Sequence, residues 1–281
     1  MAIQKSAKEK ANADALRVLV MRAPGINADE ETALAFELAG ANPERVHILE
    51  LLEKRKKLSD YDIAVIPGGF SYGDYISSGK ILGNKIKFNL RDDFDKFIRA
   101  GKPVLGICNG FQVLVKAGML PGGDDGSFSK KPTCTLFQND LGRFQDRWVH
   151  FAKVSKNREI MAGVQKIFCP INHGEGKFIP QSKELLEELY ANDQVIFKFT
   201  TAEGKIADKF PDVPNGSTDA ITGICNRTGN VIGLMPHPEK YLYPQNDPYW
   251  CINGLQKASA DGRGFFESIV KFGQKAKEKG G

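Results

Sequence analysis

Cys108 lies where an apolar stretch, PVLGI, gives way to a helical pattern, in the local sequence GICNG. Glycines on both sides of a nucleophile permit the sharp strand-to-helix turn of a nucleophile elbow, which holds the side chain at the carboxyl end of a sheet. The amino end of the following helix favours thiolate over thiol, and the backbone N–H of Asn109 is placed to donate to an oxyanion. A cysteine between apolar residues is otherwise a small buried hydrophobe, so catalysis also requires a base.

His237 is the best candidate for that base among the four histidines. It follows the apolar stretch NVIGLMP and continues as His237-Pro238-Glu239. The proline fixes the backbone between the two side chains, so the carboxylate of Glu239 can orient the imidazole and stabilise its cation. Cys108, His237 and Glu239 therefore predict a Cys-His-Glu triad for acyl transfer.

Short apolar strands alternate with helices around these residues. The expected strands cover residues 17–22, 45–49, 63–69 and 103–108, and the expected helices cover 28–41, 89–101 and 111–118. This alternation predicts an α/β fold in which helices cover both faces of a mainly parallel sheet. The later strand-like segments, 147–154, 194–200, 220–226 and 230–236, add an antiparallel portion before a C-terminal helix.

No linker or internal repeat divides the chain. We expect a polar N-terminal arm over residues 1–15 and a single domain over residues 16–281. The polar, Gly- and Pro-rich segments 121–135 and 208–217 are interpreted as insertions in that domain.

The composition excludes several classes of protein. Five scattered cysteines without a C-x-x-C pair argue against a zinc site or a disulfide framework and fit a reducing, cytoplasmic environment. The net charge of +5 is mild, and no basic cluster with stacking aromatics indicates nucleic-acid binding. No apolar run is long enough to span a membrane, and the N-terminus lacks the pattern of a secretory signal.

Two motifs together carry a family resemblance. GICNGFQ and MPHPE resemble the triad, or class I, glutamine amidotransferases, which implies a flavodoxin-like fold. Further segments are similar to the glutaminase component of phosphoribosylformylglycinamidine (FGAM) synthase and follow that family's order: PGGFSYGDYISSGK (67–80), LGRFQDRWV (141–149), NHGEGKF (172–178), PNGS (214–217) and GNVIGLMPHPEK (229–240).

The resemblance implies a role for each site residue. Cys108 would attack the side-chain amide of L-glutamine and form a glutamyl thioester. His237 would take the thiol proton and pass it to the departing ammonia, while Glu239 would orient His237. The backbone N–H of Gly69 would be the second oxyanion donor beside that of Asn109. Four positions would hold the substrate: Gln112, His173, Gly174 and Glu175, the last as a partner for the α-ammonium group.

The resemblance also implies a partner. No G-x-x-x-x-G-K-[ST] loop is present, so ATP and Mg²⁺ are expected on a larger synthase subunit (PurL), which would use the ammonia to convert FGAR to FGAM in purine biosynthesis. A small PurS-type subunit is a further expected partner. Arg143, Arg147 and Trp148 are expected to face the partner, the alternative being a strand with a solvated charged face. Lys240 replaces an arginine common in the family, which would weaken a bidentate contact.

Alternatives remain open from the sequence. The chain could be the glutaminase of another synthetase, such as those for GMP, carbamoyl phosphate or anthranilate, but GFSYGDY differs from the loop expected there. A cysteine hydrolase that uses no glutamine would share the elbow but is not expected to carry H-P-E at a late strand end. A non-catalytic interaction subunit is disfavoured by the complete triad.

Overall fold

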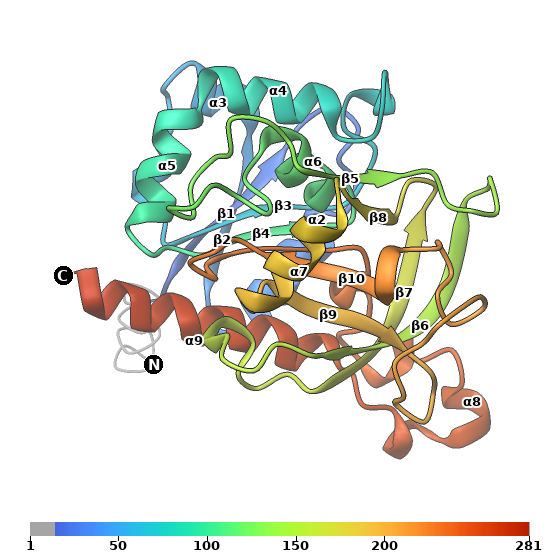
Figure 1. The fold of residues 1–281 in the computed structure, drawn as a ribbon. Coiled ribbons are helices and arrows are strands. Elements are labelled where there is room, and N and C mark those ends of the chain that lie inside the picture. Colours follow the sequence, from blue (N-terminus) through green and yellow to red (C-terminus); the bar gives the residue numbers. More distant parts are fainter. Residues whose placement is uncertain (1–14, 281) are drawn as a thin grey trace, which may run out of the picture.

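The computed structural model describes residues 15–280, so the predicted polar arm lies outside the described residues except for its last position. Its main sheet has nine strands in the order β2-β1-β3-β4-β11-β10-β9-β6-β7 (Figure 1). A second sheet pairs β5 with β8. The strands are β1 (Arg17–Arg22), β2 (Asn42–His47), β3 (Ile63–Ile66), β4 (Val104–Ile107), β5 (Cys134–Phe137), β6 (Gln145–Lys153), β7 (Lys166–His173), β8 (Lys177–Pro180), β9 (Val195–Thr200), β10 (Ile221–Cys225) and β11 (Val231–Leu234).

The main sheet is parallel on one side and antiparallel on the other. β2, β1, β3, β4 and β11 run parallel to one another. β10, β9, β6 and β7 continue from β11 in antiparallel pairs. Every residue of β3, β4 and β11 is buried, as expected for strands covered on both faces. The predicted α/β fold with an antiparallel extension is confirmed.

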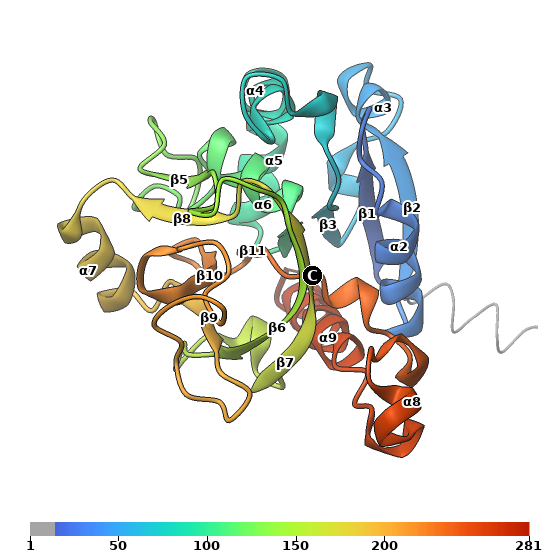
Figure 2. The ribbon, with the colours of Figure 1, turned by 90° about the vertical axis from the view of Figure 1, so that its right-hand side faces the viewer.

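Helices lie on both faces of this sheet. Figure 1 shows α4, α5 and α6 on one side and the long α9 on the other, and Figure 2 shows the same layers from the side. α2 packs against α9 through Phe36 and Phe266, whose rings meet edge to face at 5.0 Å. The helices are α2 (Asp29–Leu38), α3 (Ile48–Leu52), α4 (Lys80–Asn89), α5 (Arg91–Arg99), α6 (Asn109–Ala117), α7 (Lys183–Ala191), α8 (Trp250–Asn253) and α9 (Gly262–Gly280).

The strand predicted at 45–49 ends earlier than expected. β2 stops at His47, and α3 begins at once. The ring of His47 accepts the N–H of Leu49, while Glu50 accepts the N–H of His47 at 3.2 Å. This reciprocal capping box starts a helix inside a segment that otherwise has strand-forming residues.

β7 is a strand that the sequence pattern did not indicate. Pro170 lies within it, and proline normally argues against a strand because it lacks the N–H for a ladder. β7 is the last strand of the sheet, so only one of its edges is paired in the sheet. The carbonyl of Pro170 accepts the N–H of His237 at 2.8 Å and so joins this edge to the segment after β11.

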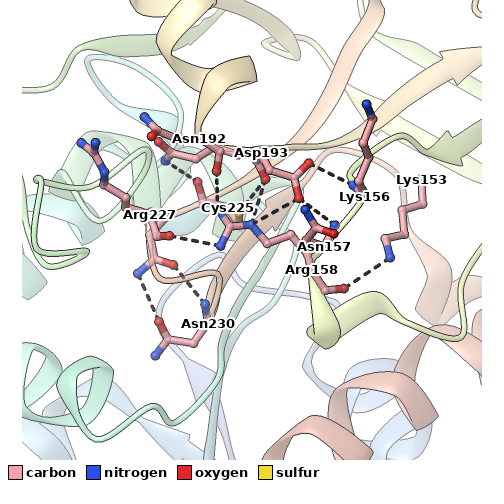
Figure 3. Close-up of polar contacts among 11 residues, drawn as sticks. Lys153, Lys156, Asn157, Arg158, Asn192, Asp193, Cys225, Arg227 and Asn230 are labelled. Carbon is pink, nitrogen blue, oxygen red and sulfur yellow. Dashed lines mark hydrogen bonds and ion pairs between the residues drawn. The ribbon is translucent and has the colours of Figure 1, made fainter.

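A polar cluster fixes the end of the sheet opposite His237 (Figure 3). The guanidinium of Arg158 donates to the carbonyls of Asp193 at 2.8 Å and Arg227 at 3.1 Å, and also to that of Asn192. Asn192 and Asp193 lie in the turn that leads into β9, and Arg227 lies in the turn that joins β10 to β11. Arg158 therefore stabilises the start of the strand whose other end leads to His237.

All five cysteines are free thiols, four of them buried and Cys251 exposed. Among the helices described, none has the length and apolar character needed to cross a bilayer.

Candidate active site

The backbone turns sharply at Cys108, between β4 and α6. Its φ of 51° and ψ of −105° are values that residues other than glycine rarely adopt, and strain of this kind is typical of functional sites. A Cβ on Gly110 would lie 1.8 Å from the carbonyl oxygen of Ile66, and one on Gly106 would lie 2.7 Å from that of Gly110. The two glycines therefore let α6 start directly against β3 and β4, which is the geometry of a nucleophile elbow.

His237 and Glu239 meet at the end of β11. Nδ1 of His237 lies 2.6 Å from Oε1 of Glu239, and the two residues are 3% and 2% exposed. A Cβ on Gly68 would lie 2.8 Å from Cε1 of the ring, so the imidazole packs directly on the backbone after β3. Close packing against glycine and the carboxylate together fix the orientation of the ring.

The charges around His237 favour its cation. Burial alone lowers the pKa of the imidazole, but Glu239 and Cys108 outweigh burial and raise the pKa to about 9. The thiol of Cys108, which is 4% exposed, donates to the carbonyl of Asn172 at 3.5 Å. Nε2 of His237 is buried and has no aligned hydrogen-bond partner among the described residues. Catalytic hydrogen bonds commonly align only once substrate is bound.

Two backbone N–H groups lie beside the elbow without acceptors in the backbone of the described residues. Ile26 and Gly69 form an isolated antiparallel bridge. Its two hydrogen bonds are made by the residues beside them: the N–H of Asn27 donates to the carbonyl of Gly68 at 3.3 Å, and the N–H of Phe70 donates to the carbonyl of Gly25 at 2.7 Å. That pattern leaves the N–H of Gly69 unused. Asn109 is the first residue of α6, where the N–H has no partner within the helix. Gly69 and Asn109 can therefore donate to an oxyanion.

The side chain of Asn109 ties the loop after β3 to the elbow. It accepts the N–H of Ser71 at 3.1 Å and donates to Asp74 at 3.1 Å and to Gln112 at 2.9 Å. Gln112 in turn donates to the carbonyl of Glu175 at 2.6 Å. In the described structure Gln112 thus links the nucleophile helix to the turn between β7 and β8.

Two carboxylates lie side by side at this turn. Glu175 accepts the N–H of Ser78 at 3.1 Å, and the hydroxyl of Ser78 donates to Asp74 at 2.9 Å. Burial is the main cause that raises the pKa of Asp74, and the charge of Glu175 adds to it against the hydrogen bonds that lower it. The pair presents negative charge that suits an ammonium group. Asp74 was not identified from the sequence, although it lies within the GFSYGDY motif.

His173 ends β7 and is 2% exposed. Burial, together with the nearby charge of His237, lowers its pKa to about 3, so its ring is neutral. Its Nδ1 lies 3.3 Å from Oδ1 of Asn139, and its ring packs so closely on Gly176 that a Cβ there would lie 2.1 Å away. Gly174 follows directly, and its carbonyl accepts the N–H of Asn139 at 2.9 Å. The structure brings His173, Gly174 and Glu175 to the elbow.

The segment expected to face a partner is divided. Arg143 is exposed. Arg147 lies 4.8 Å above the ring of Phe210 within the same chain. Trp148 is half-buried and meets Tyr241 edge to face at 5.2 Å. Arg147 and Trp148 therefore make contacts within the chain while remaining partly exposed, whereas Arg143 is exposed.

Lys240 reaches the strand that faces Cys108. Its ammonium group donates to the side-chain oxygen of Asn172 at 2.6 Å, while the backbone carbonyl of Asn172 accepts the Cys108 thiol. A lysine at this position supplies a point contact where an arginine could make two parallel ones. Within residues 15–280, no group of three or more His, Cys, Asp and Glu residues is arranged to hold a metal ion.

Comparisons with known proteins agree with this geometry. Residues 15–273 match the family model of the CobB/CobQ-like glutamine amidotransferase domain. The fold also resembles that of a glutamine amidotransferase from Thermotoga maritima, with a TM-score of 0.51 at 17% identity over 93% of this chain and 97% of that one. The fold and the sequence match define a glutamine amidotransferase.

The nearer relatives identify the branch of this class. The chain is 44% identical over 249 residues to phosphoribosylformylglycinamidine synthase subunit PurQ of Methanococcus maripaludis strain S2, covering 87% of this chain and 90% of the relative. It is 40% identical to the Archaeoglobus fulgidus subunit over 92% of this chain and 98% of the relative. A chain in the structure of PurLQS from Thermotoga maritima matches with a TM-score of 0.68 and 29% identity, over 92% and 99% of the two chains. The chain belongs to the PurQ family, which confirms the family that the motifs indicated.

Proposed function

We propose that this chain is the glutaminase subunit of FGAM synthase, which hydrolyses L-glutamine to glutamate and supplies ammonia to a synthase subunit. The observation that carries the proposal is the elbow at Cys108, placed beside the buried His237–Glu239 pair in a chain of the PurQ family. The nucleophile comes from one segment and the base with its orienting carboxylate from another, 129 residues further on; the two segments meet at the carboxyl ends of β4 and β11.

The reaction proceeds in two acyl transfers. Sγ of Cys108 attacks the side-chain carbonyl carbon of glutamine, and His237 takes the thiol proton. The oxyanion that forms accepts hydrogen bonds from the N–H groups of Gly69 and Asn109, each of which contributes about 3 kcal/mol in comparable sites. The intermediate collapses by breaking the C–N bond, and the His237 cation gives its proton to the leaving ammonia. Water, deprotonated by His237, then hydrolyses the γ-glutamyl thioester to glutamate and restores the thiol.

Substrate binding uses the turn between β7 and β8. The carboxylates of Asp74 and Glu175 attract the α-ammonium group of glutamine, and Glu175 is the position that the family resemblance assigns to it. Gln112, His173 and Gly174 complete this side of the site. The hydrogen bonds of Gln112 to Asn109 and Glu175 keep the turn in register with the elbow.

The partner docks on an exposed apolar rim formed by Phe70, Tyr75, Ile76 and Phe144. These side chains are 44%, 73%, 87% and 48% exposed, and the rings of Phe70 and Phe144 lie 6.2 Å apart. Asn109 connects the loop that bears three of them to the elbow. Burial of Cys108 supports an account in which docking on the apolar rim opens the site, so that the isolated chain has little glutaminase activity.

ATP and Mg²⁺ bind to the larger, PurL-type synthase subunit, which converts FGAR to FGAM. A small PurS-type subunit completes the assembly. The match to a chain in the structure of PurLQS from Thermotoga maritima supports this partnership. We expect neither nucleic acid nor a membrane to be a partner. The five free thiols favour the reducing environment of the cytoplasm.

The experiment is to reconstitute the chain with its synthase subunits and supply either glutamine or ammonia. Cys108→Ala should abolish FGAM formation from glutamine and leave formation from ammonia intact. Cys134→Ala, at a buried cysteine whose thiol faces the carbonyl of Leu120, is the matched control and should retain both. Loss of both activities in Cys108→Ala, or full glutamine use by that variant, would contradict the proposal.

A further inference from the structure

Asn139 is a buried amide in the connection between β5 and β6, with 2% of its surface exposed. Its Oδ1 accepts the N–H of Gly176 at 3.0 Å, and its Nδ2 donates to the carbonyls of His173 at 2.8 Å and Arg143 at 3.1 Å. A backbone N–H needs an acceptor and a carbonyl needs a donor. These contacts therefore fix which end of the amide is oxygen.

The orientation of this amide determines the tautomer of His173. Nδ1 of the ring lies 3.3 Å from the same Oδ1, which can only accept, so Nδ1 must carry the proton. In a neutral imidazole the other nitrogen, Nε2, then has a lone pair and no proton. That Nε2 is buried and has no hydrogen-bond partner among the described residues. A buried acceptor without a donor is rare in folded proteins, and here it lies beside the catalytic centre.

Neutrality of His173 matters because of its neighbours. The titratable group that acts on it is His237, whose charge lowers the pKa of His173, and the Cys108 thiol lies nearby, where it donates to the backbone carbonyl of Asn172. The nearest residues on its own turn are already engaged, since Glu175 accepts from Ser78 and Lys177 pairs with Asp140. A second cation beside His237 would oppose formation of the imidazolium that the reaction requires.

We infer that Asn139 is a positioning residue that holds His173 as a neutral imidazole protonated on Nδ1, so that Nε2 accepts a hydrogen bond from an N–H group of bound glutamine. The inference deepens the proposed function and rests on it for the identity of the ligand. The tautomer itself follows from the contacts of Asn139 alone. Glutamine offers two such donors, its α-ammonium and its side-chain amide.

The tautomer is tested without activity. Long-range ¹⁵N–¹H correlation spectra of the full chain, labelled at histidine, separate the two neutral tautomers and the imidazolium, and His173→Gln assigns the signal by its loss. At neutral pH we expect His173 to carry its proton on Nδ1 with a bare Nε2. A proton on Nε2, or on both nitrogens, would overturn the inference while leaving the glutaminase proposal untouched.

The positioning role is tested with Asn139→Asp in the reconstituted complex. This variant keeps an acceptor for Nδ1 but adds a negative charge that favours protonated His173, which cannot accept a hydrogen bond. We expect KM for glutamine to rise roughly ten- to hundredfold, as for loss of a hydrogen bond to substrate, and the acid limb of kcat/KM to move to higher pH. Glutaramate, which lacks the α-amino group, distinguishes the two donors. If Asn139→Asp leaves the KM for glutaramate unchanged, the α-ammonium group of glutamine is the donor.

Asn215→Asp is the matched control. Asn215 is also a fully buried amide and donates to the carbonyl of Gly176 at 2.8 Å, but it does not contact the ring of His173. It should perturb the same turn without moving the pH profile. Equal loss of activity in both variants, with unchanged pH profiles, would show that Asn139 is merely structural. Should Asn139→Asp fail to fold, the spectra of the unmodified chain still decide the inference.

Discussion

Nδ1 of His237 lies 2.6 Å from Oε1 of Glu239, although only Pro238 separates the two residues. Proline restricts the backbone at this point, and a short 3₁₀ turn over Pro238–Lys240 brings the carboxylate back to the ring. Because the carboxylate occupies Nδ1, Nε2 is the nitrogen available to exchange a proton with Cys108. The short His-Pro-Glu sequence thus sets the direction of proton transfer.

Glu239→Gln should move the alkaline limb of glutamine use to lower pH. Burial lowers the pKa of His237, whereas Glu239 and Cys108 raise it to about 9, so removal of the carboxylate lowers the pKa of the imidazole. The imidazolium that protonates the leaving ammonia is then lost at lower pH, and kcat at neutral pH should fall at least roughly tenfold. The measurement is the pH profile of kcat/KM for glutamine.

Asp247→Asn is a suitable control for that variant. Asp247 accepts a hydrogen bond from Tyr241 in the same C-terminal segment and does not contact His237. Its pH profile should match that of the unmodified chain. An unshifted alkaline limb in Glu239→Gln would contradict the assignment of Glu239 as the orienting carboxylate.

Gly68→Ala should impair catalysis by displacing His237. The added Cβ would lie 2.8 Å from Cε1 of the imidazole, closer than side-chain carbons approach one another, so the ring must shift. Since a shift of about 1 Å can cost roughly a hundredfold in rate, we expect a large fall in kcat with a smaller effect on KM. Steady-state kinetics of glutamine-dependent synthesis measure both.

Gly264→Ala provides the comparison. Gly264 lies in α9, where an added Cβ would meet no neighbouring atom within 4 Å, so alanine there should leave kcat unchanged and raise helix stability by up to about 1 kcal/mol. Equal kinetics in the two variants would mean that His237 does not need the surface of Gly68.

Ile76→Asp should weaken assembly with the synthase subunit. Ile76 is 87% exposed on the apolar rim, where a carboxylate would have to be desolvated on docking. Ile252→Asp is the control, because Ile252 is matched in exposure, at 83%. Ile252 lies in α8, whereas Ile76 comes just before α4, and the two helices lie at opposite ends of the molecule (Figures 1 and 2). Calorimetric titration should give at least a roughly tenfold weaker affinity for Ile76→Asp alone. Equal binding by both variants would place the interface elsewhere.

Local spacing was sufficient to predict much of the site. The elbow at Cys108 and the convergence of His237 with Glu239 depend on residues within a few positions of each other, and β4 and β11 are fully apolar strands that are easily recognised. The NHGEGKF motif located the turn at His173. The sequence could also indicate the mixed sheet, because its parallel and antiparallel parts differ in helix content.

Contacts between distant segments could not be predicted in this way. Asn139 reaches His173 across 34 positions, and no local pattern marks its amide as buried. The contacts of Arg147 with Phe210 and of Trp148 with Tyr241 likewise join residues that lie far apart along the chain. The sequence does not indicate α4 or β7, because glycine interrupts the helix pattern of the first and proline the strand pattern of the second.

The most direct test of the central role of Cys108 is to trap the covalent intermediate. The reconstituted complex is quenched with acid during glutamine turnover, digested, and mapped by mass spectrometry. We predict a γ-glutamyl adduct on the peptide that contains Cys108, and on none of the peptides of the other four cysteines. An adduct on a different cysteine, or glutamine turnover without any adduct on Cys108, would contradict the account.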